Sequence, residues 1–395
     1  MNDRDLRRAL LTTVPPDELG AQRRAWRLAR AAFDEREPSP WPQRHARPLI
    51  AAALAVAVLA AVLSAPGRAV IGNVRDAIGT EKVVGVPQAK PALFSLPTEG
   101  RLLVTAPTGA WIVSADGAKR RLGDYREASW SPRGLHAVVS NRSQLVAVTP
   151  NGAVRWAIAR PAVHGARWSP SGFRIAYLSG SNLRVVYGDK SRDRRYDSAA
   201  NVAPAWKPVE EHILAYVTPR NVLTVTETDA EQGLWTARVR ATPALLEWSA
   251  DGRRLLTAVP LSGRRFALTV YDSTGRRLQS LAVPGTFVSA AFAPGDHRIA
   301  VVRRRGARSE LFIADADLLR RQEPVFEGAG RFSDVAWSPG GKWLVLGWQS
   351  ADQWLFIRST DVEKIKAVSS LAKQFDPGGT GAGFFPRIEG WCCAE

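Results

Sequence analysis

Residues 334–347 read DVAWSPGGKWLVLG, a tryptophan followed by a Ser-Pro-Gly turn and then by a run of apolar residues. Related stretches occur at 126–140, REASWSPRGLHAVVS, and at 165–179, GARWSPSGFRIAYLS. Pro and Gly in the turn favour a sharp reversal of the chain, and the β-branched and aromatic residues after it favour a strand. The repeated unit therefore predicts short antiparallel strands joined by tight turns.

The motif recurs along most of the chain. Its tryptophans lie at positions 130, 168, 206, 248 and 337, with Phe292 in the same place of a sixth copy, so successive copies are 38 to 45 residues apart. A period near 40 with several short strands per repeat is typical of a β-propeller, in which each repeat forms one four-stranded sheet. The first strand of each sheet lines the centre of the ring, and a large aromatic side chain at its end packs between neighbouring sheets. We therefore interpret the repeated tryptophan as a packing residue.

Two incomplete repeats remain at the ends of this region. Residues 101–122 supply a second, third and fourth strand without a first, whereas residues 384–392, FFPRIEGWC, supply a lone strand with Trp391 in the motif position. Joining them would close the ring and remove the exposed strand edges of an open sheet. The predicted fold is an all-β, seven-bladed β-propeller, with six WSPxG repeats and one blade split between the two ends. Cys392 and Cys393, the two cysteines of the chain, are expected as ordinary small side chains at the end of the closing strand.

The repeats also resemble a known family. WSPxG followed by an apolar strand, as in RWSPSGFRIAYLS and AWSPGGKWLVLGW, is similar to the repeats of TolB-like (WD40-like) propellers over about residues 98–395. The whole layout resembles single-pass membrane proteins of actinobacterial type, which implies an envelope protein with a binding propeller. The copies at Trp206 and Phe292 lose parts of the motif, so their blades are expected to pack less regularly.

The segment before the propeller predicts a membrane anchor. Residues 48–65, PLIAAALAVAVLAAVLSA, carry no charge and are long enough as a helix to span the hydrocarbon core of a bilayer. Arg44, His45 and Arg47 lie just before this run, which favours an N-terminus inside the cell. The predicted organisation is a helical cytoplasmic segment (1–47), a transmembrane helix (48–65), a juxtamembrane helix and linker (66–97) and a propeller (98–395). The predicted localisation is the cell membrane, single-pass, with the propeller outside.

Catalytic and metal-binding signatures are missing from the sequence. There is no GxSxG, no GxxxxGK[ST] and no Cys/His spacing of a zinc site, and the equivalent His136 and His212 belong to different blades. We therefore expect no cofactor, no metal and no enzyme activity. Carboxylates cannot be paired from sequence alone, so a propeller hydrolase or lyase stays as an alternative, which buried carboxylates converging in the central channel would support.

The chain is strongly basic, with a formal net charge of +17 and a pI near 10.6. In an antiparallel meander, the turns between second and third strands lie on the same face of the ring as the connections between blades. Basic and aromatic residues gather in these segments, and we take that basic loop face as the candidate surface for an acidic partner. Its predicted residues are Tyr125, Arg126, Arg142, His164, Arg220, Arg264, Arg265, Phe287, Arg304 and Arg331.

Three functions fit these observations. The first is a membrane-anchored extracytoplasmic propeller that serves as a non-catalytic scaffold for a protein or an anionic envelope polymer. The second is a transmembrane signalling regulator, in which residues 1–47 hold a cytoplasmic protein and the propeller is the sensor. That N-terminal segment resembles anti-sigma regulators in layout, but it lacks the zinc ligands of their metal-binding type. The third is the hydrolase or lyase. No nucleic-acid partner is expected, because the predicted membrane separates the basic surface from the genome.

Overall fold

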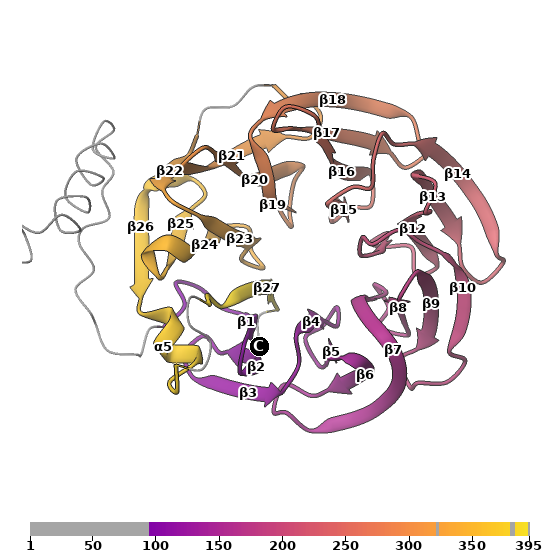
Figure 1. The fold of residues 1–395 in the computed structure, drawn as a ribbon, viewed down its shortest axis with the longest axis horizontal. Coiled ribbons are helices and arrows are strands. Elements are labelled where there is room, and N and C mark those ends of the chain that lie inside the picture. The colour runs from indigo at the N-terminus through magenta and orange to yellow at the C-terminus, as the bar shows by residue number, and fades with distance from the viewer. Residues whose placement is uncertain (1–94, 321–323, 380–383, 394–395) are drawn as a thin grey trace, which may run out of the picture. The chain divides into compact units, whose positions relative to one another are not determined.

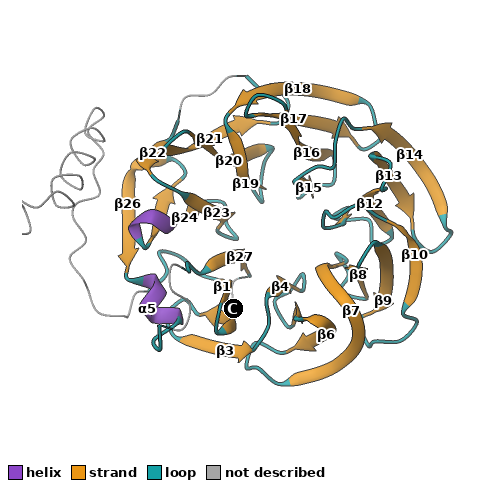
Figure 2. Ribbon diagram, viewed as in Figure 1, coloured by secondary structure: helices purple, strands orange, loops and turns teal. Residues whose placement is uncertain are grey.

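The computed structural model describes residues 95–320, 324–379 and 384–393, and these residues form a ring of antiparallel sheets (Figure 1). The predicted segments 1–47 and 48–65, and residues 66–94 of the linker, lie outside the described residues. Most described residues belong to strands or to the loops that join them, as Figure 2 shows. The tight turns carry glycine at positive φ in the repeated motif, as at Gly134 (64°), Gly172 (79°) and Gly341 (66°).

Five sheets have four strands each. The sheet that joins the two ends contains β27 (Arg387–Cys392), β1 (Arg101–Ala106), β2 (Gly109–Val113) and β3 (Lys119–Gly123). The second four-stranded sheet contains β11 (Ala205–Trp206), β12 (Ile213–Val217), β13 (Val222–Glu227) and β14 (Gln232–Arg238). The third contains β15 (Leu245–Trp248), β16 (Arg254–Leu261), β17 (Arg265–Asp272) and β18 (Arg277–Pro284). The fourth contains β19 (Thr286–Phe292), β20 (Arg298–Arg305), β21 (Arg308–Asp315) and β22 (Phe326–Ala329). The fifth contains β23 (Phe332–Trp337), β24 (Trp343–Trp348), β25 (Gln353–Arg358) and β26 (Asp361–Ser369).

The sixth sheet has seven strands. It contains β4 (Glu127–Trp130), β5 (Ala137–Ser140), β6 (Arg142–Val148), β7 (Val154–Trp168), β8 (Arg174–Ser179), β9 (Asn182–Tyr187) and β10 (Arg194–Ser198). Strand β7 belongs to two repeats at once, because its first part pairs with β6 and its last part pairs with β8. Val163 is the residue that has a partner on both sides, Arg142 in β6 and Ser179 in β8.

The prediction of seven separate blades is therefore wrong. The described residues form five four-stranded blades and one seven-stranded sheet in which two repeats are merged. The physical reason is that β7 continues from Val154 to Trp168, through an irregularity at Ala162 (φ 49°), where the repeat pattern predicted a break. A ladder that continues through β7 leaves no loop to separate the two repeats.

The repeated tryptophan is buried as predicted in several repeats, whereas Trp130 and Trp168 are half-buried. Trp206, Trp248 and Trp337 are buried. The indole Nε1 of Trp206 donates to the carbonyl of Arg167 at 3.0 Å, and that of Trp337 donates to the carbonyl of Ala291 at 2.9 Å. Both acceptors precede the motif aromatic of an earlier repeat, so each bond ties two consecutive inner strands together.

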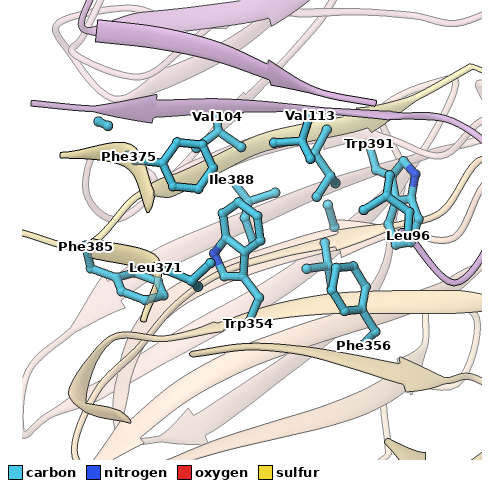
Figure 3. Packing of buried hydrophobic residues seen from close by; sticks show 14 residues of the cluster. Leu96, Val104, Val113, Trp354, Phe356, Leu371, Phe375, Phe385, Ile388 and Trp391 are labelled. Atoms are coloured by element: carbon cyan, nitrogen blue, oxygen red, sulfur yellow. The ribbon is translucent and has the colours of Figure 1, made fainter. Parts of the chain in front are cut away.

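The two ends of the described chain meet in one sheet. Strand β27 pairs antiparallel with β1, with Trp391 opposite Leu102. Between this sheet and the β23–β26 sheet lies an aromatic core that includes Trp354, Phe356 and Trp391 (Figure 3). Phe356 and Trp391 meet edge to face with ring centroids 5.7 Å apart. Cys392 and Cys393 are joined by a disulfide at the end of β27, rather than lying as separate small side chains.

Helices are minor elements of the described residues. They are a short 3₁₀ helix, Gln349–Ala351, and α5, Leu371–Phe375. Across the ranges that the structure describes, no helix is long and apolar enough to cross a membrane. This finding is a correction to the predicted transmembrane helix and to the single-pass membrane localisation that was based on it.

Candidate functional site

The predicted docking residues differ in exposure. Seven arginine side chains are exposed, as a docking surface requires: Arg126, Arg142, Arg220, Arg264, Arg265, Arg304 and Arg331. The three other residues are more buried. His164 is half-buried with its Nδ1 at 2.9 Å from the carbonyl of Ala162, and Phe287 is half-buried against Phe266 with ring centroids 5.3 Å apart.

Tyr125 is a core residue and not a surface residue. Its side chain is 9% exposed and packs with Leu122 and Ala128 in the cluster between the first two repeats. Burial raises the pKa of its hydroxyl above the ordinary value. A partner on the loop face would therefore not reach this ring, and the face is basic with little aromatic surface.

Two predicted arginines come together in one cleft. Arg264 follows β16, Arg304 ends β20, and both line a cleft of about 310 Å³ with Thr286 and Arg305. Gly285 lies in the same cleft, and its backbone N–H donates to the carbonyl of Arg264 at 2.8 Å. Within the described part of the chain, neither Arg264 nor Arg304 has a carboxylate partner. The other exposed arginines of the loop face do not line this cleft.

Next to this cleft lies a buried ion pair that the sequence did not reveal. Arg303 and Glu310 are opposite each other on β20 and β21, with side chains 9% and 7% exposed. Arg303 donates to one carboxylate oxygen of Glu310 through Nε at 2.7 Å and Nη2 at 2.5 Å, and its guanidinium lies 5.1 Å from the ring centroid of Phe312. Arg303 is thus a structural residue, although it is adjacent to Arg304 in the sequence.

Charged side chains also line a cavity of about 560 Å³ at the centre of the ring. They are Arg167, Glu247, Asp334, Arg387 and Glu389, which come from β7, β15, β23 and β27. These inner strands surround the centre in Figure 1. The sequence analysis missed these residues, although each lies one to four positions before a motif tryptophan, on the strand predicted to line the centre.

The charges of this cavity have different partners. Asp334 accepts from Arg387 Nη2 at 3.5 Å and from the backbone N–H of Ile388 at 3.4 Å. Glu389 accepts from the hydroxyl of Thr105 at 2.7 Å. Three carboxylates and two guanidinium groups therefore share one cavity, but Asp334 and Arg387 are the pair in direct contact.

Burial in the cavity shifts the carboxyl groups. It raises the pKa of Glu247 to about 7, against the opposing effect of a backbone N–H from Phe292. Burial also raises the pKa of Asp334 and of Glu389, and nearby arginines oppose this shift in both. Carboxyl groups with a raised pKa in a concave site are typical of ligand-binding or catalytic positions, so these half-buried carboxylates are the ones that would favour the hydrolase or lyase alternative.

A second group of titratable side chains resembles a metal site. One ligand atom each of His212, Glu227 and Asp229 lies within 4.8 Å of the others. However, Asp229 already accepts from Arg174 at 2.5 Å, and Glu227 accepts the backbone N–H groups of Asp229 and Ala230. A guanidinium in the group opposes a cation, so we assign no metal to it.

On the face with the WSPxG turns, His297 bridges two repeats. Its Nδ1 lies 2.8 Å from Asp317, and its Nε2 lies 2.9 Å from Asp251 in the turn of the preceding repeat. Arg254 donates to the same Asp317 at 2.5 Å. The hydrogen bonds to the two carboxylates raise the pKa of His297 although burial opposes the shift. This cluster is a link between sheets with defined partners.

Comparison with known proteins supports the fold. No protein-family model and no curated protein matches the chain. Among solved structures, Hsv2 of Kluyveromyces lactis is 14% identical, with 69% of this chain and 95% of that chain covered and a TM-score of 0.51. The WD40 domain of Neurospora crassa Pan2 is 8% identical, with coverage of 62% and 78% and a TM-score of 0.50. At such identities the likeness shows the fold alone: the described chain is an all-β propeller similar to WD40 propellers, and the TolB-like type stays a prediction.

Proposed function

We propose that this propeller is a non-catalytic binding scaffold that docks an acidic protein or an anionic polymer on its basic loop face. The observation that carries the proposal is the cleft between Arg264 and Arg304, where exposed guanidinium groups meet without carboxylate partners in the described chain. A propeller offers a rigid ring on which loops hold such groups in place. The fold is consistent with this role.

The chemistry of the cleft favours an anion. Guanidinium groups present forked donors that match carboxylate, phosphate or sulfate oxygens, and they remain charged at any physiological pH. Arg305 lies in the same cleft, and its contact with Glu310 is a long one of 3.5 Å. It therefore adds positive charge beside the two unpaired arginines. Exposed charges of this kind chiefly set the rate and the selectivity of association, and salt weakens their effect.

The test uses the double variant Arg264→Glu/Arg304→Glu and labelled poly-L-glutamate as the acidic probe. Fluorescence anisotropy at several salt concentrations should show binding by the wild-type chain that weakens with salt, and a loss of about tenfold or more in the variant. The matched control is Arg133→Glu/Arg358→Glu, which makes the same change in net charge at two exposed arginines, one in a WSPxG turn and one at the end of β25, and neither of them lines the cleft. Equal losses in both variants would mean that the probe senses net charge, and the proposed docking face would then be rejected.

The hydrolase or lyase alternative has one observation in its favour, the three half-buried carboxylates of the central cavity. If the chain is a hydrolase, turnover of a panel of aryl glycosides and esters should be measurable and should disappear in Glu247→Gln. Turnover that survives this substitution would exclude a catalytic role for Glu247.

A further inference from the structure

Two opposite charges line the central cavity without forming an ion pair with each other. Arg167 donates through Nη1 to the neighbouring carbonyl of Ala166 at 2.8 Å, and within the described ranges no carboxylate contacts it. Glu247 accepts from the backbone N–H of Phe292 at 3.1 Å and has no cationic contact there. The two groups are still close enough for the guanidinium to lower the carboxyl pKa against the effect of burial.

The other charges around them already have partners. Asp334 and Arg387 contact each other, and Thr105 donates to Glu389. Arg167 is therefore the guanidinium of the cavity without a carboxylate contact among the described residues, and Glu247 is the carboxylate of the cavity that accepts no side-chain hydrogen bond there.

The cavity is lined by small side chains and by aromatic ones. Ala203, Ala244, Ser289 and Ala291 line it together with Gly390, and the aromatic side chains are Phe287, Phe292, Trp337 and Trp391. A volume of about 560 Å³ lies in the range of sites for small molecules, roughly 300 to 1,000 Å³. The cavity thus has room for a molecule that reaches both charges at once.

We propose that the central cavity binds a small zwitterion of the amino-acid class, with its ammonium group at Glu247 and its carboxylate at Arg167. A ligand carboxylate fits the forked donors of a guanidinium, and an ammonium group has three donors for a carboxylate and nearby carbonyls. A simple amine would leave Arg167 without a partner, and a simple carboxylate would leave Glu247 without one. The pairing of both charges therefore favours a molecule that carries both.

This site is separate from the basic cleft. Arg264 and Arg304 do not line the cavity, and Arg167 and Glu247 do not line the cleft. Phe287 of the predicted loop face does line the cavity, so the cavity reaches toward the face where the partner is proposed to dock. Failure of either proposal leaves the other standing, since each depends on its own residues.

The experiment is isothermal titration calorimetry on the full chain with each standard L-amino acid, n-butylamine and acetate. At least one amino acid should bind about tenfold more tightly than the amine and the carboxylate. Glu247→Gln and Arg167→Met should each weaken that binding by about tenfold or more, while Arg133→Met, at an exposed turn outside the cavity, should leave it unchanged. Circular dichroism on each variant verifies that the ring is folded.

Proton release gives a second readout. Glu247 must be ionised to pair with an ammonium group, so binding near pH 6 should release a proton, seen as a dependence of the enthalpy on the buffer. Glu247→Gln should abolish this dependence. The proposal is overturned if n-butylamine binds as tightly as the best amino acid, if no amino acid binds the folded wild-type chain, or if Glu247→Gln leaves affinity and proton release unchanged.

Discussion

The central cavity and the basic loop face both carry charged side chains, but the two regions hold them in different ways. In the cavity, Asp334, Arg387 and Glu389 have partners, and burial raises the pKa of the carboxyl groups. On the loop face, Arg264 and Arg304 are exposed and lack carboxylate partners among the described residues. The charged groups of both regions contribute equally to the net charge of the chain. The environment of each group decides whether it stabilises the fold or is available to a partner.

The comparison is sharpest at two adjacent arginines of β20. Replacing Arg303 with Met leaves the buried carboxylate of Glu310 with only its 3.5 Å contact to Arg305, and breaking such a buried pair costs about 3 to 5 kcal/mol. Replacing Arg304 with Met removes an exposed charge, and we expect a change below about 0.5 kcal/mol. Urea unfolding followed by circular dichroism measures both free energies.

The double variant Arg303→Met/Glu310→Leu is the control for this prediction. It removes both charges at once, so it should recover much of the stability that Arg303→Met loses. Similar unfolding free energies for the Arg303 and Arg304 variants would show that Arg303 is not held in a buried pair, and the distinction between the two residues would fail.

The next effect concerns Glu247. Its pKa in the folded chain, about 7, lies above that of an unfolded glutamate, about 4.3. The folded state therefore holds a proton that the unfolded state has lost, and the stability from this group falls as pH rises from about 4 to 7. At about 1.4 kcal/mol per pKa unit, Glu247→Gln should remove a decline of about 3 to 4 kcal/mol. Unfolding free energies at a series of pH values measure it, and an unchanged pH profile in the variant would contradict it.

The repeat pattern predicted much of the fold because it is local. The WSPxG turns and the strands after them follow from residues close together in the chain, and the packing of Trp206 and Trp337 follows from the period at which the motif recurs. The merged sheet was not predictable in this way, since it depends on Val163 pairing with both Arg142 and Ser179. The positive φ of Arg142, 73°, belongs to that arrangement, and no residue type in the sequence signals it.

The candidate site was predictable only in part. The sequence placed arginines on the loop turns, and seven of the predicted arginines are exposed. It did not reveal the buried pair of Arg303 and Glu310 beside Arg304, because the alternation of a strand assigns faces only once the register is known. The sequence did contain a signal for the charged cavity, because acidic residues lie just before the motif tryptophans in strands predicted to line the centre. The environment of these residues, however, depends on the closure of the ring.

The smallest effect is expected at His297, which is intermediate between the two regions because its side chain is 22% exposed while both aspartate partners are 41% exposed. Its pKa is raised, so its contribution to stability is complete below about pH 6.5 and is lost as pH rises through the folded value. His297→Asn should cost about 0.5 to 1 kcal/mol at pH 6 and close to nothing at pH 9. His136 is the matched control, since burial lowers its pKa and the pH dependence removed by His136→Asn should have the opposite sign. If both variants change the pH dependence of the unfolding free energy in the same direction, the hydrogen bonds to Asp251 and Asp317 do not govern the titration of His297. Partly exposed charges in this ring would then contribute as little to stability as the exposed arginines of the loop face.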